Sequence, residues 1–199
     1  MHYRSNFRRA ALVGVIAAVI GTAASAQEAP VNQDVQRNVN QQQRIENGVK
    51  DGQLTTRETA HLEQGQAHID RMEQRDLRNG PLTSQEQAQI QHAENVESRD
   101  IYRDAHNGAV QNPDSPSSRR MAADVQRDVN QEKRIDQGVR SGSLNDGQVA
   151  RLQGREAHVD HLEHNAGANG HVNRAEQRRI QHTENRDSRA IHRQKKAGA

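Results

Sequence analysis

The chain contains one sequence unit twice, and this duplication limits the folds open to it more than any other feature. Residues 34–40 (DVQRNVN) recur as residues 124–130 (DVQRDVN), at an offset of 90 residues. The offset continues without gaps to the end of the second copy, where residues 98–102 (SRDIY) match residues 188–192 (SRAIH). Internal repeats of this kind mark a structural unit, so the fold has to accommodate two copies of one small module.

Each copy is predicted to form three amphipathic helices. In the first copy, Val35, Val39 and Ile45 follow one helical stripe over about 33–48, and apolar residues of 62–72 and 90–101 form two more. Short turns rich in Gly, Asn and Thr separate these stripes, and short turns favour antiparallel neighbours. The predicted fold class is all-α, with two tandem antiparallel three-helix modules. An extended three-helix hairpin without a closed core is the alternative.

Composition indicates where the two modules begin and end and which segments lie outside them. We assign residues 27–106 to the first module and residues 121–193 to the second. Residues 107–120 are rich in Pro, Ser, Asn and Gly, which is typical of a linker. Residues 194–199 form a short basic tail.

Residues 1–26 have the pattern of a cleavable signal peptide. Three arginines precede a short apolar run over 10–24, and Ala-Ser-Ala at 24–26 forms a small-residue cleavage site. The run is shorter than the ~20 apolar residues of a membrane-spanning helix. We therefore expect a periplasmic or secreted protein with no stable membrane insertion after cleavage.

Removal of this segment changes the charge balance. Three of the 28 Lys and Arg residues lie in it, which leaves 25 against 26 Asp and Glu residues. The mature chain also keeps a single aromatic residue, Tyr102, and it has no Cys. Nucleic-acid binding needs a basic surface and often aromatic platforms for bases, so we expect no nucleic-acid partner. Without disulfides, stability must come from helix packing.

The four turns resemble the second half of an EF-hand calcium loop. They occupy residues 51–58 (DGQLTTRE), 79–86 (NGPLTSQE), 141–148 (SGSLNDGQ) and 169–176 (NGHVNRAE). An EF-hand loop needs a Gly at its sharp turn and a Glu at its last position. Only the fourth turn is partly equipped with oxygen ligands, and its candidate calcium ligands are Asn165, Asn169, Asn173 and Glu176. Ordinary helix caps at all four turns are the alternative.

Histidines supply a second candidate metal site. His158, His161 and His164 stand at three-residue steps, so neighbours on one helix can share an ion. Imidazole suits zinc, copper and nickel. A helical wheel places His161 and His164 on the solvent side, and a solvated polar face is the alternative. Two histidine positions recur in both copies, as His68/His158 and His92/His182, and suggest interhelical hydrogen bonds or pH-sensitive groups.

Two polar positions fall on the apolar stripe of the third helix in each copy. Glu94 and Ser98 in the first copy match Glu184 and Ser188 in the second. Buried charges are nearly always paired, so hydrogen bonds between helices are expected. Contact with a second subunit, in a homo-oligomer, is the alternative.

The mature chain resembles a group of uncharacterised exported proteins of proteobacteria. Their modules read NQQxRIxxGVxxGxLT, NGxLTxxE and SRxIY, and the second copy of this chain departs from that pattern at Asn145, Asn173 and His192. The likeness is carried here by residues 40–45, 48–49, 52, 54–55, 79–80, 82–83, 86 and 98–102. The resemblance implies export but no activity. The Leu-Thr-x-x-Glu turns are also similar to those of Spy-type periplasmic chaperones.

No catalytic motif is present in the sequence: it has no Cys, no P-loop, no H-E-x-x-H and no G-x-S-x-G. We therefore expect a non-enzymatic exported protein that acts by binding. The first hypothesis is a protein-interaction or stress-related role, chaperone-like, through an apolar groove between helices. The second is binding of zinc, copper, nickel or calcium. Specific chemistry is expected first between residues 158 and 176, where the histidine triplet and the best-equipped turn lie.

Overall fold

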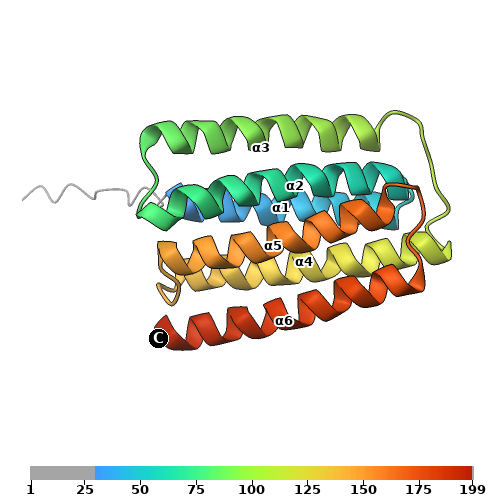
Figure 1. The fold of residues 1–199 in the computed structure, drawn as a ribbon. Helices are drawn as coiled ribbons and strands as arrows, with labels where there is room; N and C mark the ends of the chain where they lie inside the picture. The colour runs from blue at the N-terminus through green and yellow to red at the C-terminus, as the bar shows by residue number, and fades with distance from the viewer. Residues whose placement is uncertain (1–29, 199) are drawn as a thin grey trace, which may run out of the picture.

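The computed structural model describes residues 30–198, which form α-helices joined by short turns (Figure 1). The first copy contributes α1 (Pro30–Lys50), α2 (Thr56–Asp76), the 3-10 turn η1 (Leu77–Asn79) and α3 (Ser84–Ala105). The second contributes α4 (Pro116–Arg140), α5 (Asp146–Gly167) and α6 (Arg174–Gly198). Residues 30–198 contain no strand, so the all-α prediction is confirmed. The signal peptide predicted over 1–26 lies outside the described residues.

The helices of the two copies pack across each other. α2 packs mainly on α5, and α1 packs mainly on α4, so each of these contacts joins equivalent helices of the two copies. Both pairs run antiparallel. In α1 and α4, Lys50 Nζ donates to Gln126 Oε1 at 2.9 Å, and Arg140 Nη2 donates to Gln36 Oε1 at 2.7 Å at the other end. In α2 and α5, Gln153 Nε2 donates to Glu73 Oε2 at one end, and His164 Nδ1 donates to the Ala60 carbonyl oxygen at the other. α3 and α6 lie on opposite sides of these four central helices (Figure 1). The copies therefore form one packed body.

Two helices extend into segments that the sequence assigns to other parts. α4 begins at Pro116, within the linker predicted over 107–120, because Ser115 caps the helix and Pro is well suited to its first position. α6 continues to Gly198, so most of the tail predicted over 194–199 is helical. Lys195 Nζ in that tail donates to the carbonyl oxygen of Arg134 at 3.1 Å. No described helix combines the length and the apolar character that a membrane span requires.

All four turns end in the same capping arrangement. The first residue of each pair accepts a hydrogen bond from the backbone N–H of the second, whose side chain accepts from the backbone N–H of the first. The four pairs are Thr55/Glu58, Thr83/Glu86, Asn145/Gln148 and Asn173/Glu176. The glycine that precedes each pair has a positive φ, between 70° and 115°. The shared turn sequence therefore encodes a sharp turn followed by a helix cap.

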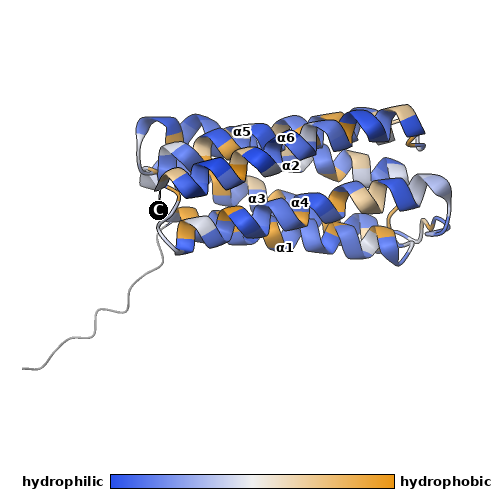
Figure 2. Ribbon diagram, turned by 90° about the horizontal axis from the view of Figure 1, so that it is seen from below, coloured by the Kyte–Doolittle hydropathy of each residue, from blue (hydrophilic) through white to orange (hydrophobic). Residues whose placement is uncertain are grey.

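The buried apolar residues gather at the two ends of the bundle. One cluster includes Ile45, Leu62 and Val159, and the other includes Val35, Ile135 and Leu152. Each cluster takes residues from both copies, since α1 and α2 are antiparallel to α4 and α5. Hydrophilic residues alternate with the few hydrophobic ones along every helix (Figure 2). The middle of the bundle is therefore filled largely by polar side chains.

This packing predicts that the two copies unfold together. Leu62→Ala and its counterpart Leu152→Ala each remove a fully buried side chain, at a cost of about 2–5 kcal/mol. Each variant should lower the midpoint of one common thermal transition, measured by circular dichroism at 222 nm. Two separate transitions, with each substitution affecting only one, would contradict the interlocked packing.

Candidate functional site

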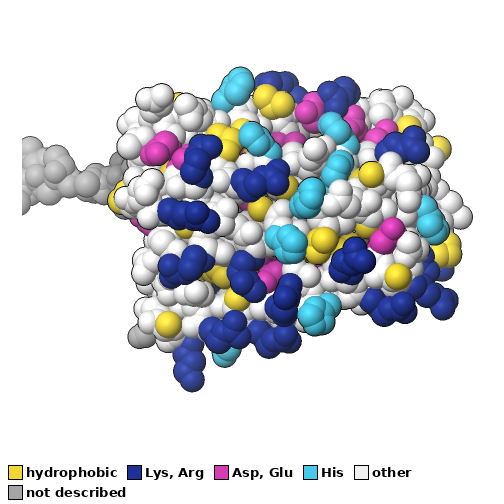
Figure 3. Space-filling model, viewed as in Figure 1, with side chains coloured by type: hydrophobic (Ala, Val, Ile, Leu, Met, Phe, Trp, Pro, Cys, Tyr) yellow, Lys and Arg dark blue, Asp and Glu magenta, His cyan; other side chains and the backbone are white. Residues whose placement is uncertain are grey.

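Charge is divided unevenly between the inside and the outside of the protein. All six helices contribute buried Asp or Glu residues, whereas no Lys, Arg or His is buried among the described residues. On the face shown in Figure 3, Lys, Arg and His side chains are prominent and Asp and Glu are sparse. Burying a charge is costly unless it is paired. The question is therefore how each buried carboxylate is neutralised.

Two of the buried acids of the outer helices, one in each copy, are paired with arginines. Glu94 of α3 lies 3.2 Å from Arg37 Nε, and Glu184 of α6 lies 2.7 Å from Arg127 Nε. The nearby serines are bonded in the same way, since the Arg44 and Arg134 guanidinium groups donate to Ser98 Oγ and Ser188 Oγ, both at 2.7 Å. The polar residues on the apolar stripe of α3 and α6 thus form hydrogen bonds and ion pairs between helices, as the sequence predicts.

The acids in the middle of the bundle have no such partners. They lie on α2, α4 and α5, and none forms an ion pair with a Lys or Arg within the described chain. Each is at most 3% exposed. These residues are Glu63, Asp70, Glu73, Asp128, Glu132, Glu156, Asp160 and Glu163.

Four of these acids converge on one point, which we call the acidic centre: Glu63 of α2, Asp128 of α4, and Asp160 and Glu163 of α5. One carboxylate oxygen from each lies within 4.8 Å of the others. Gln42 Nε2 donates to Glu63 Oε2 at 3.0 Å. No protein group donates a hydrogen bond to either oxygen of Asp128 or to either oxygen of Glu163. The acidic centre therefore combines four carboxyl groups with almost no protein donors.

Burial and mutual repulsion both disfavour the charged forms of these groups. Burial is the main cause that raises the pKa of Asp128, Asp160 and Glu163 well above the ordinary range, and neighbouring carboxylates raise it further. Burial also raises the pKa of Glu63, to about 7. Two of the acids, Asp128 and Glu163, lie within hydrogen-bonding reach of each other when one is protonated. The acidic centre must therefore take up protons or a cation.

Because the chain is duplicated, the residues equivalent to the acidic centre form a second group of four. This group also lies in the middle of the bundle, toward the other end from the acidic centre. At the offset of 90 residues, Gln153 matches Glu63, Asn38 matches Asp128, and Asp70 and Glu73 match Asp160 and Glu163. We call these four residues the amide centre.

In the amide centre, the two amide side chains donate hydrogen bonds to the two acids. Asn38 Nδ2 donates to Glu73 Oε1 at 3.0 Å, and Gln153 Nε2 donates to Glu73 Oε2 at 2.8 Å. A longer bond of 3.5 Å joins Asn38 Nδ2 to Asp70 Oδ1. Two amides thus replace two of the four carboxylates and supply the donors that the acidic centre lacks. The acids of the amide centre therefore have donors within the protein, whereas the acids of the acidic centre depend on protons or a cation from outside.

The histidine triplet does not form a single ligand set. His158 and His161 are exposed, and the Nε2 atom of His161 accepts from Asn165 Nδ2 at 3.1 Å. His164 is half-buried, contrary to the expectation from the helical wheel, because α2 packs over it and its Nδ1 donates to the carbonyl oxygen of Ala60 at 2.8 Å. Among the described residues, only the acidic centre brings three or more His, Asp or Glu ligand atoms so close together.

The residues proposed as calcium ligands within the fourth turn accept hydrogen bonds from the backbone instead. Asn173 Oδ1 accepts from the N–H groups of Ala175 and Glu176, and the Glu176 carboxylate accepts from the Asn173 N–H. Asn169 Oδ1 accepts from the N–H of His171 at 2.8 Å. Asn165, paired with His161, contributes nothing to this turn. The structure therefore uses the turn as a helix cap.

The acidic centre was missed because sequence reasoning treats acids as surface residues. A signal was nevertheless present: in both copies an acid directly follows an apolar residue of the buried stripe. Asp70 and Asp160 follow Ile69 and Val159, and Glu163 follows Leu162. An acid that adjoins the stripe and is retained in both copies is a fair indicator of a buried carboxylate.

No protein-family model, curated protein or solved structure matches this chain. The function has to be inferred from the arrangement of its own residues.

The raised pKa values predict an unusual dependence of stability on pH. Burial raises the pKa of Glu63 to about 7 and those of Glu73 and Glu132 to about 8, from about 4.3 for an unfolded Glu. Groups with a raised pKa in the folded state stabilise it fully below the unfolded pKa, and this stabilisation is lost as pH rises through the folded values. The melting temperature of chelator-treated protein should therefore fall from pH 5 to pH 9. A constant or rising melting temperature over this range would contradict the prediction.

Proposed function

We propose that the protein is an exported, non-enzymatic binding protein for a hard divalent cation, such as calcium or manganese, which the acidic centre holds inside the helix bundle. The observation that supports this proposal best is the convergence of four buried carboxyl groups without a protein counter-charge. Buried charges that persist in proteins are paired or coordinate metals. The pattern of residues 1–26 supports the exported location.

The spacing of the ligand atoms fits such an ion. Oxygen ligands lie 2.3–2.6 Å from calcium, so two ligands on opposite sides of the ion are about 5 Å apart at most. The four oxygens of the acidic centre lie within 4.8 Å of one another, which matches this limit. Asp128 and Glu163 each have a second free oxygen, so both can bind in a bidentate manner.

The ligand chemistry also selects among metals. Carboxylates suit magnesium, calcium and manganese, whereas imidazole and thiolate favour zinc and copper. The acidic centre contains carboxylates alone. We therefore favour calcium or manganese over the zinc, copper and nickel suggested by the histidine triplet.

Protons and the cation compete for the acidic centre. The raised pKa of Asp160 and Glu163 means that these acids hold protons near neutral pH when no cation is bound, and Glu63, with a pKa of about 7, is partly protonated there. Metal ligands must be deprotonated, so binding releases protons and strengthens as pH rises. The same cation removes the electrostatic penalty that destabilises the bundle at high pH.

A chaperone-like role is less well supported. Binding of unfolded clients calls for a broad exposed apolar surface. The large apolar residues exposed in the described chain are Val96, Tyr102 and Val110. Two lie on α3 and the third lies in the loop that follows it, so they offer little area for a client.

The amide centre provides a template for testing the cation site. Glu63→Gln with Asp128→Asn converts the acidic centre to the composition of the amide centre. We expect calcium or manganese at 100 times Kd to stabilise the wild-type protein by about 2.7 kcal/mol at pH 7.5. The double variant should show no such effect, while its metal-free form should melt at least as high as the metal-free wild type. Differential scanning calorimetry measures both quantities.

The reverse substitution is the matched control. Asn38→Asp with Gln153→Glu gives the amide centre four carboxyl groups, so isothermal titration calorimetry should find two bound cations per chain where the wild type binds one. Unchanged cation binding in the Glu63→Gln, Asp128→Asn variant would rule out the acidic centre. Binding that is instead lost in His161→Ala would assign the ion to the histidine triplet.

A further inference from the structure

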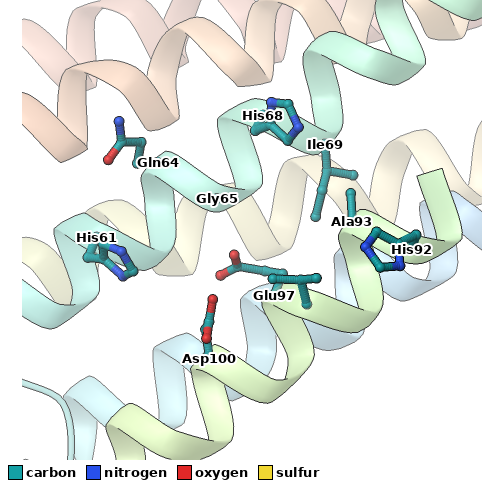
Figure 4. Close-up of a pocket in the computed structure, with 10 residues that line it drawn as sticks. His61, Gln64, Gly65, His68, Ile69, His92, Ala93, Glu97 and Asp100 are labelled. Atoms are coloured by element: carbon teal, nitrogen blue, oxygen red, sulfur yellow. The ribbon is translucent and has the colours of Figure 1, made fainter. Parts of the chain in front are cut away.

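A groove of about 380 Å³ lies between α2 and α3, on the outside of the first copy (Figure 4). His61, Gly65 and His68 of α2 line one side, and His92 and Glu97 of α3 line the other. The Glu97 carboxylate points toward α2 at Gly65 (Figure 4). Ile69, Ala93 and Val96 add apolar surface to the walls. The groove thus combines the Glu97 carboxylate with apolar side chains and three histidines.

Glu97 is a buried acid without a basic partner. The residue is 6% exposed, and its carboxylate accepts a hydrogen bond from the neutral amide of Gln66, while its Oε1 atom accepts none. Burial, with repulsion from Glu63 and Asp100, raises its pKa to about 8. Asp100 beside it is already paired with Arg103 at 2.5 Å. The groove therefore has an unmet need for positive charge.

In the second copy, the equivalent groove contains its own positive charge. Between α5 and α6, Arg155 stands at the position of Gly65 and Asp187 at the position of Glu97. Arg155 Nη2 lies 2.6 Å from Asp187 Oδ1. A second arginine, Arg186, occupies the position of Val96 at the rim. The second groove thus contains its own guanidinium group, bound to the acid at its base.

The first copy lacks both arginines but has an acid at the equivalent position. A Cβ atom at Gly65 would collide with the Glu97 carboxylate, so the absence of a side chain there lets the carboxylate pack against α2 at the base of the groove. Val96 is 36% exposed and leaves the rim uncharged.

We propose that the α2/α3 groove binds the guanidinium group of an external ligand, in the role that Arg155 fills in the α5/α6 groove. The planar guanidinium donates two parallel hydrogen bonds to a carboxylate, which makes it a favoured partner for Glu97. The apolar walls at Ile69, Ala93 and Val96 fit the aliphatic stem of an alkylguanidine or an arginine side chain. The groove's volume is within the usual range for small-molecule sites. The proposal does not require a cation in the acidic centre, although Glu63 of that centre repels the Glu97 carboxylate.

Butylguanidinium is the simplest probe, and butylurea, which has the same shape without the charge, is its control. Isothermal titration calorimetry of the purified protein at pH 8.5, where Glu97 is mostly ionised, should detect binding of butylguanidinium only. Glu97→Gln should weaken it at least about tenfold, because a hydrogen-bonded charge pair is lost. Val96→Arg, which restores the second copy's rim charge at an exposed site, should also weaken it. Asp187→Asn, in the other groove, should leave the affinity unchanged.

A gain of binding gives the sharpest result. Arg155→Gly removes the built-in guanidinium, so a second molecule of butylguanidinium should bind per chain. An arginine peptide, acetyl-Gly-Arg-Gly-amide, separates the two sources of the group: tighter binding than butylguanidinium indicates a peptide ligand, and equal binding a small molecule. Equal affinity for butylurea, an unchanged affinity in Glu97→Gln, binding of zinc alone, or no binding at 10 mM would each overturn the proposal.

Discussion

Repulsion among buried carboxyl groups is the constraint on which the rest of this structure depends. The apolar clusters at the two ends of the bundle hold α1, α2, α4 and α5 together, and between them α2, α4 and α5 bring the eight acids named above into the middle of the bundle. Removing carboxylates from water is expensive, and grouping them makes it more so. Each part of the bundle must therefore provide a neutralising partner, whether an arginine, an amide, a proton or a bound cation.

The duplicated chain offers several of these solutions side by side. Arginines neutralise Glu94, Glu184 and Asp187, and amides satisfy the acids of the amide centre. Because equivalent positions share the same backbone environment, each difference between copies isolates a change of side chain. Asp128 in place of Asn38, and Gly65 in place of Arg155, are differences of charge on a common scaffold. In both cases the site without an internal partner is the one to which we assign a ligand.

The sequence allowed much of the scaffold to be predicted but not its interior. Helical stripes and turn residues determined the helices, and the caps at Thr55 and Thr83 follow from local hydrogen bonding. The pairing of α2 with α5 depends on contacts between residues about a hundred positions apart, such as His164 with Ala60, which periodicity within one helix does not reveal. The same limitation hid Asp128 and Glu163, because a helical wheel for one helix cannot show that acids of three helices meet.

The separation of acids from bases has a consequence for how the folded protein behaves toward other molecules. With 25 Lys and Arg against 26 Asp and Glu, the chain after residue 26 is almost neutral when every one of these groups is counted as charged. Acids that stay protonated in the interior contribute no charge, whereas the basic side chains remain in water. We therefore expect the native, metal-free protein to have a higher isoelectric point than its own unfolded chain, so that it behaves as a cation under conditions in which the denatured polypeptide carries almost no net charge.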